Sequence, residues 1–204
     1  TPASRPAATL PSPERRQELL FEAARLGRTD IIPLLAKQGA DLNGYNERGF
    51  TPLILAAYNG QAEAVDTLIS NGADPCKPDA NQGNTAQMGV AFKGNDGLAA
   101  RLLKEKCDVN VLNRSGQTAL MMASLFGRTA QVEMLLRAGA DPHVIDASGR
   151  TAASVAKAQG NASVAERLFT QRQPGAAHSK PDQWLTGYQQ LLPVGKHMFS
   201  DTLG

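Results

Sequence analysis

A short motif, Gly-x-Thr, recurs along this chain at nearly constant spacing, and this spacing constrains the fold more than any other feature. Its glycines are Gly49, Gly83, Gly116 and Gly149, so successive copies are 34, 33 and 33 residues apart. A fixed period of this length is typical of repeat proteins, whose units bury their apolar faces only by stacking on their neighbours. The sequence therefore predicts a stack of repeated units with one continuous core.

Each copy of the motif lies within a longer repeated phrase. The aligned segments are GADLNGYNERGFTPLILAAYNG (39–60), GADPCKPDANQGNTAQMGVAFKG (72–94), KCDVNVLNRSGQTALMMASLFG (106–127) and GADPHVIDASGRTAASVAKAQG (139–160). Between them, apolar residues recur at helical spacing, as at Val132, Leu135 and Leu136. A divergent first unit, ELLFEAARLGRTDIIPLLAKQ (18–38), has the helical pattern without the Gly-x-Thr motif.

A unit of about 33 residues with a turn and two helices resembles the ankyrin repeat. The resemblance covers residues 16–169 and implies an all-α repeat solenoid, an ankyrin stack of about five units with β-hairpin fingers. The expected domains are a flexible Pro/Ala leader (1–15), the repeat domain (16–169) and a C-terminal tail with a short amphipathic segment (170–204). The expected units are 16–45, 46–78, 79–112, 113–145 and 146–169.

The motif threonines are predicted to cap the first helix of each unit, and the glycines that follow each helix are predicted to end it with positive φ. The family's motif TPLH is replaced here by TPLI, TAQM, TALM and TAAS, so its histidine is absent. The fingers are therefore expected to depend on backbone hydrogen bonds and packing.

Gly89 is unusual because it replaces Leu55 of the preceding unit within a predicted helix. A glycine inside a helix costs about 0.5–1 kcal/mol relative to alanine. Either a close contact between helices or a slot for a ligand would explain it. An additional residue in DANQGN also lengthens the finger of this unit, for no purpose that the sequence reveals.

Two cysteines, Cys76 and Cys107, lie in consecutive fingers. Cys107 replaces the alanine of the GAD phrase, and adjacent fingers could bring the two Cα atoms within disulfide range. The alternative is a small buried residue at Cys107 and an unrelated thiol at Cys76. A disulfide is expected if the protein is exported.

The sequence contains no arrangement of residues that indicates catalysis or metal binding. The histidines, His143, His178 and His197, are not spaced as metal ligands, and no nucleophile or phosphate-loop motif is present. With 21 basic and 19 acidic residues, the charge is too balanced to predict a nucleic-acid surface. No apolar run is long enough to insert into a membrane. We therefore expect no enzyme activity and no metal site.

The aromatic residues indicate a binding surface. Between residues 22 and 168 they are Tyr45, Phe50, Tyr58, Phe92 and Phe126, and none replaces an aliphatic core residue. The resemblance implies that partners contact the finger tips and the exposed ends of the first helices. The predicted partner-binding residues are Tyr45, Arg48, Phe50, Tyr58, Asn59, Phe92, Lys93, Arg114, Leu125 and Phe126.

Tyr58, Phe92 and Leu125 occupy equivalent positions in successive units, so they are expected to form a stripe along the concave face. Clustered apolar surface usually marks an interaction site, and aromatic residues supply many hot spots. The alternative is that these rings pack sideways between the fingers.

The two ends of the chain give weaker indications. Trp184, Tyr188, Leu191 and Leu192 form a short apolar face in the tail, which could pack on the last repeat, contact a partner or be disordered. The leader TPASRPAATLPSPE could follow a removed signal peptide or belong to a trimmed chain. We expect a periplasmic or otherwise exported protein, with a cytoplasmic location as the alternative. The oligomeric state is not predicted.

The segments GNTAQMGVAFKGN and GQTALMMASLFGR are similar to those of small bacterial periplasmic ankyrin proteins encoded beside catalases. That resemblance implies a protein partner, a haem catalase, and a role in oxidative-stress defence. It also suggests a haem-binding chaperone as a rival function, with Tyr58 as the haem ligand, because tyrosinate can bind haem iron. A third alternative is an immunity or effector-type ankyrin protein with another target.

Overall fold

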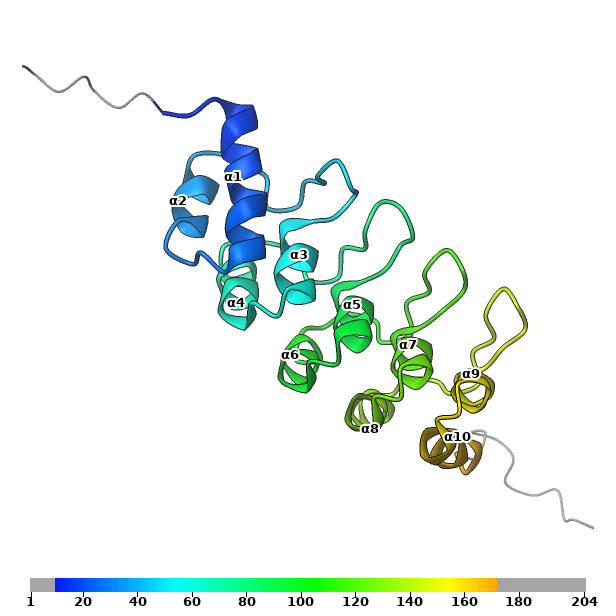
Figure 1. Cartoon of the computed structure of the whole chain (residues 1–204). Helices are drawn as coiled ribbons and strands as arrows, with labels where there is room; N and C mark the ends of the chain where they lie inside the picture. The colour runs from blue at the N-terminus through cyan, green and yellow to red at the C-terminus, as the bar shows by residue number, and fades with distance from the viewer. Residues whose placement is uncertain (1–9, 172–204) are drawn as a thin grey trace, which may run out of the picture. The chain divides into compact units, whose positions relative to one another are not determined.

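The computed structural model describes residues 10–171 of the 204-residue chain. Within this range the chain forms α-helices and no β-strand (Figure 1). The helices are α1 (Pro13–Leu26), α2 (Ile32–Lys37), α3 (Pro52–Tyr58), α4 (Ala62–Ser70), α5 (Ala86–Lys93), α6 (Asp96–Leu102), α7 (Ala119–Leu125), α8 (Thr129–Arg137), α9 (Ala152–Ala158) and α10 (Ala162–Phe169).

The helices form two layers, with long loops extending from one side (Figure 1). Successive odd-numbered helices pack on one another, and each contacts the even-numbered helix that follows it. We call the odd-numbered helices inner and the even-numbered helices outer. The loops 38–51, 71–85, 103–118 and 138–151 lead from an outer helix to the next inner helix, and we call them fingers. The all-helical repeat architecture is as predicted, whereas the expected β-hairpins are not confirmed, since no strand is present among residues 10–171.

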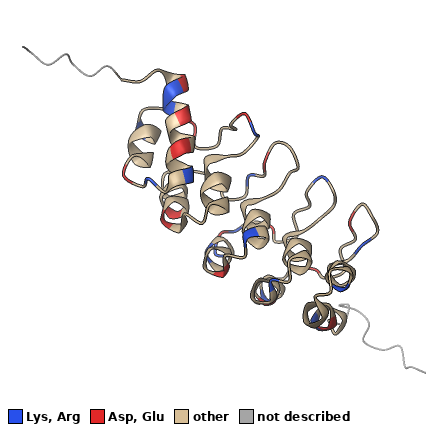
Figure 2. Cartoon of the chain, viewed as in Figure 1, with Lys and Arg blue, Asp and Glu red and all other residues tan. Residues whose placement is uncertain are grey.

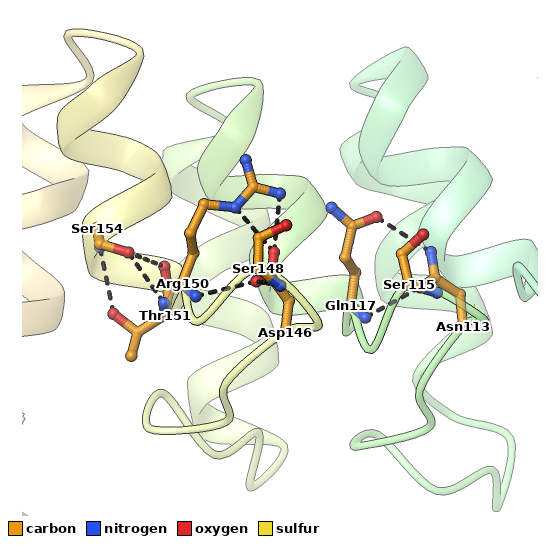
Figure 3. Close-up of polar contacts among 8 residues, drawn as sticks. All are labelled: Asn113, Ser115, Gln117, Asp146, Ser148, Arg150, Thr151 and Ser154. Carbon is orange, nitrogen blue, oxygen red and sulfur yellow. Dashed lines mark hydrogen bonds and ion pairs between the residues drawn. The ribbon is translucent and has the colours of Figure 1, made fainter.

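The predicted capping residues position the inner helices. The hydroxyl oxygen of Thr51 accepts a hydrogen bond from the backbone N–H of Ile54, and the threonines that begin α5, α7 and α9 do the same. In α9 a capping box forms, because Thr151 also donates its N–H to Ser154 Oγ at 2.9 Å (Figure 3). Gly94 ends α5 with φ 78°, a conformation that other residues rarely adopt.

The core consists of aliphatic side chains, and alanines contribute much of the inner layer. Ala56, Ala91, Ala123 and Ala156 are fully buried in four successive inner helices, where small side chains allow helices to approach closely. Among residues 10–171 no aromatic side chain is buried. The rings are therefore excluded from the core and are available to the surface.

The tip of each finger is closed by one Asn or Asp side chain. Asn46, Asp79, Asn113 and Asp146 accept hydrogen bonds from backbone N–H groups two to five residues ahead. Figure 3 shows this arrangement for Asn113 and Asp146. The expectation that the fingers depend on backbone bonds and packing was therefore incomplete, because these side chains provide additional acceptors.

The lengthened finger uses both carboxylate oxygens of Asp79. Oδ1 accepts from the N–H groups of Asn81 and Gln82, and Oδ2 accepts from that of Asn84. In the last finger, the backbone N–H and then the guanidinium of Arg150 hold the pKa of Asp146 below its usual value. Asp146 is buried, so its charge is stabilised mainly by these contacts.

Neighbouring fingers are also joined by backbone hydrogen bonds. Ala80 donates to the carbonyl of Gly49 at 2.9 Å, Arg114 to that of Gln82 at 2.8 Å, and Ala147 to that of Ser115 at 3.0 Å. The fingers therefore form a connected edge, although no strand is formed.

Basic and acidic side chains are interspersed over the helices and fingers (Figure 2). Two ion pairs link adjacent outer helices: Arg101 of α6 pairs with Asp66 of α4, and Arg167 of α10 pairs with Glu133 of α8 at 2.6 Å. None of the helices within residues 10–171 is long and apolar enough to cross a membrane.

Candidate functional site

Three aromatic rings from successive units contact one another at the ends of the inner helices. Tyr58 is the last residue of α3, Phe92 lies in the last turn of α5, and Phe126 directly follows α7. Tyr58 stacks on Phe92 with ring centroids 5.9 Å apart, and Phe92 meets Phe126 edge to face at 4.9 Å. Both arrangements are favourable for aromatic pairs. We call these three residues the aromatic row.

The aromatic row is open to solvent. Tyr58 and Phe92 each have 41% of their surface exposed, and Phe126 is half-buried. The ammonium of Lys93 lies 4.4 Å from the centroid of the Tyr58 ring, where a cation is attracted by the π-electrons. The row therefore presents apolar surface together with a positive charge.

A groove of about 390 Å³ lies beside the row, and Tyr58 and Phe92 belong to its wall. Its lining residues come from inner helices α1, α3, α5 and α7 and from the first two fingers. Its other lining residues include Arg25, Arg48, Phe50, Leu55, Asn59, Met88, Gly89 and Met122. Its volume is within the range of sites that hold a ligand or an inserted side chain.

Gly89 leaves part of this groove empty. A Cβ atom added at this position would meet only Cδ2 of Tyr58, at the ordinary contact distance of 3.7 Å. No backbone atom of a neighbouring helix lies within 4 Å of that Cβ position, so a close helix contact does not explain why this residue is glycine. Leu55 and Met122 occupy the equivalent positions of the flanking units and also line the groove. Gly89 therefore creates a gap between two larger side chains.

The structure brings some of the predicted partner-binding residues together. Arg48, Phe50, Tyr58, Asn59 and Phe92 line the groove. The guanidinium of Arg48 lies 5.6 Å from the ring centroid of Phe50, and that ring packs partly against the core. Phe50 thus packs against the core, whereas Tyr58 and Phe92 of the row are exposed.

Other predicted residues lie apart from the groove. Tyr45 is 42% exposed, and its hydroxyl donates to the carbonyl of Pro78 in the next finger at 3.1 Å. The guanidinium of Arg114 donates to the carbonyl of Ala80 at 2.7 Å. Both side chains therefore connect fingers. Trp184 and Tyr188 are outside the described residues.

The expected stripe differs in its third member. The register predicted Leu125 beside Phe92, but the ring of Phe126, one residue later, makes the contact, and Leu125 is half-buried. Phe126 is the C-cap residue of α7, and its N–H bonds to the carbonyl of Met122. Phe126 was among the predicted partner-binding residues, but the alignment of the units did not place it in the stripe.

Comparison with known proteins supports the assignment of the repeats. The sequence profile described as "Ankyrin repeats (3 copies)" matches residues 8–79 and 87–182. These ranges make up most of the chain. The chain belongs to the ankyrin-repeat family.

Similar ankyrin proteins are diverse. The chain is 33% identical over 104 residues to Ankyrin repeat and SAM domain-containing protein 6 of Rattus norvegicus, covering 50% of this chain and 12% of that protein. It is 36% identical over 96 residues to Ankyrin repeat domain-containing protein oryK of Aspergillus oryzae, covering 47% of this chain and 15% of that protein. It is 38% identical over 64 residues to human Mitochondrial disaggregase, covering 31% of this chain and 9% of that protein.

The matched part is thus a small fraction of each of these relatives. The likeness concerns the ankyrin repeats, which are a general protein-interaction scaffold. What this chain binds must be inferred from its own surface.

In this ankyrin stack a disulfide connects two fingers. Cys76 and Cys107 are joined, with their Cα atoms 5.3 Å apart, at the bases of the fingers before α5 and α7. The bridge closes a loop with a sequence separation of 31 residues. It thereby restrains the junction that contains Gly89 and the lengthened finger.

Among residues 10–171 no cluster of His, Cys, Asp or Glu could hold a metal ion. Tyr58, the predicted haem ligand, lies at the wall of the groove, and its ring contacts both the ring of Phe92 and the ammonium of Lys93. The sequence analysis did not identify Arg25 and Met122 as groove residues. Met122 could have been found, because it aligns with Leu55 and Gly89, whereas Arg25 belongs to the divergent first unit.

Proposed function

We propose that this ankyrin chain is a non-enzymatic scaffold that holds a protein partner on the aromatic row and in the adjoining groove. The observation that carries the proposal is the contact of three rings from three units on an open surface, beside a groove widened by Gly89. Exposed apolar clusters of this kind usually mark interaction sites, and aromatic residues are frequent hot spots.

The charges around the groove indicate what the partner carries. Arg25 and Arg48 line it and Lys93 adjoins it, and none of the three forms an ion pair within the described part of the chain. Asp79 also lines the groove, but its carboxylate oxygens accept backbone hydrogen bonds. A segment with an apolar side chain and flanking acidic residues would complement both the groove and these cations.

Partner capture from a native extract, followed by mass spectrometry, tests this proposal. The partner is then purified, and its affinity is measured for the wild type and for the double variant Phe92→Ala and Phe126→Ala. A loss of more than about 2 kcal/mol, roughly 30-fold in Kd, is expected if the rings are hot spots.

The matched control is Phe169→Ala, since Phe169 is an exposed aromatic residue on outer helix α10. This variant should bind the partner as well as the wild type does. Equal affinity of the double variant and the wild type would refute the proposed surface.

We propose two kinds of protein partner. One is a haem catalase in the periplasm, and the other is the target of an immunity or effector-type ankyrin protein. Haem itself is a rival ligand, with the Tyr58 hydroxyl as its candidate donor at the groove wall. Titration with hemin distinguishes these alternatives. A saturable iron-tyrosinate absorption band that is lost in Tyr58→Phe supports haem carriage, and the absence of saturable binding excludes it.

A further inference from the structure

One residue position at the base of each finger links that finger to the next. In the first finger, the side-chain amide of Asn43 donates to a backbone carbonyl of the second finger at 3.3 Å and accepts from a backbone N–H there at 2.7 Å. Asn110 makes the same two bonds from the third finger to the fourth, at 3.3 and 2.8 Å. Cys76 occupies this position in the second finger and is joined to Cys107 of the third. A covalent bond therefore replaces a pair of hydrogen bonds at this junction.

The base of this junction depends on the bridge. Among the described residues, the disulfide is the only bond that joins residues 72–78 to residues 106–112. The tips of the same two fingers have links of their own. Arg114 donates its backbone N–H to the carbonyl of Gln82 and its guanidinium to that of Ala80. Loss of the bridge would thus free the base of the junction while the tips stay connected.

The apolar core divides at the same junction. One cluster of buried apolar residues extends from α1 to α6, and a second extends from α7 to α10 and includes Met88 and Ala91 of α5. Ion pairs join α4 to α6 and α8 to α10, whereas within residues 10–171 none joins α6 to α8. One hydrogen bond, from Gln131 to Asp96 at 3.0 Å, connects α6 and α8 instead. The stack therefore consists of two halves, α1–α6 and α7–α10, and the bridge joins them.

We propose that the Cys76–Cys107 bridge is a redox-sensitive joint between these two halves. In the oxidised protein the halves open as one unit, and in the reduced protein the α7–α10 half opens separately. Repeat proteins allow such behaviour, because each unit contacts only its neighbours and local opening follows contiguous units. The contact of Phe92 with Phe126 crosses the joint, so reduction weakens the aromatic row as well. A loss of partner affinity on reduction rests on the function proposed above.

A dithiol is the reductant that this joint requires. Both cysteines are half-buried and line a cavity of about 300 Å³. One thiolate of the dithiol attacks a bridge sulfur and forms a mixed disulfide, and the other cysteine leaves as a thiolate that takes up a proton. The second thiolate of the dithiol then displaces the remaining cysteine. The bridge gains two electrons and two protons in total, and the dithiol becomes a cyclic disulfide.

Amide hydrogen exchange of the full chain, oxidised or reduced with dithiothreitol, tests the joint. Reduction should lower the protection of amides in α7 and α8 by about 100-fold, the factor that corresponds to the typical stabilisation by a disulfide. Amides in α3 and α4 should change far less. In NMR spectra, the nuclear Overhauser effect between the rings of Phe92 and Phe126 should weaken on reduction. The effect between Tyr58 and Phe92, which lie in one half, should persist.

Two double variants serve as controls. Cys76→Ala with Cys107→Ala should exchange like the reduced protein, with or without dithiothreitol. Cys76→Asn with Cys107→Ala supplies the amide that links the other fingers, so it should keep the halves coupled in both conditions.

Equal loss of protection in both halves on reduction would overturn the proposal, because the bridge would then stabilise the stack as a whole. Unchanged exchange on reduction would overturn it too, and so would a response of either double variant to dithiothreitol. These measurements need no partner, so they test the joint independently of the proposed function.

Discussion

Replacing Gly89 with alanine should stabilise this protein, although glycine-to-alanine changes at most of its other glycines should not. Gly89 lies in the middle of α5, and its backbone does not adopt positive φ. The added methyl group would meet only the Tyr58 ring, at 3.7 Å. The substitution therefore has a favourable effect on the helix without a steric penalty.

The magnitude follows from helix propensity. Alanine is favoured over glycine in a helix interior by about 0.5–1 kcal/mol, partly because glycine loses more conformational freedom on folding. For a folded region of this size, such a change corresponds to a rise in Tm of about 1–4 °C.

Urea unfolding of the oxidised protein, followed by circular dichroism, measures the change in the free energy of unfolding. Gly139→Ala is the matched control, since Gly139 has φ 91° and an added methyl group would meet no atom within 4 Å. Backbone strain alone should then destabilise that variant by about 1 kcal/mol. If Gly89→Ala instead lowered the free energy of unfolding as much as Gly139→Ala does, the fold itself would require glycine at position 89. The interpretation that Gly89 serves to widen the groove would then be wrong.

Two further predictions concern the fingers. Replacing both Cys76 and Cys107 with alanine should lower the free energy of unfolding by about 3–4 kcal/mol, because the bridge closes a loop with a sequence separation of 31 residues. Urea unfolding measures this change. A loss below about 1 kcal/mol would show that packing, and not the bridge, restrains the junction. Contacts with Arg150 lower the pKa of Asp146 in the folded state. The stability that the Asp146 carboxylate contributes is therefore present above its unfolded pKa of about 3.9, and it is lost as the pH falls through the folded pKa. Asp146→Asn should therefore show a shallower decrease in Tm than the wild type on acidification through this range, and identical pH profiles would contradict the proposed contacts.

Much of the fold could be predicted because its determinants are local and periodic. The Gly-x-Thr spacing, the capping threonines and the apolar positions at helical spacing each repeat once per unit, so one unit supports the interpretation of the next. The exclusion of rings from the core was also visible, because no aromatic residue replaced a repeating aliphatic one.

The remainder depends on side-chain geometry that no period specifies. The alignment of the units places Leu125 beside Phe92, but the ring of Phe126 makes the contact, and the groove at Gly89 depends on the side chains that surround it. The closure of the finger tips could have been recognised, since Asn46, Asn113 and Asp146 each precede a motif glycine by three residues. Both amide atoms of Gln87 are buried without a hydrogen-bond partner among the described residues, which the repeat pattern does not reveal.

Photo-crosslinking in a native extract tests the central claim most directly. A photoreactive phenylalanine analogue is placed at Phe92, in the middle of the aromatic row, and in a second variant at Ala130, an exposed position on outer helix α8. We expect one protein to be captured in quantity from Phe92 and not from Ala130. Equal labelling at the two positions, or no specific product at Phe92, would contradict the assignment of this surface to a protein partner.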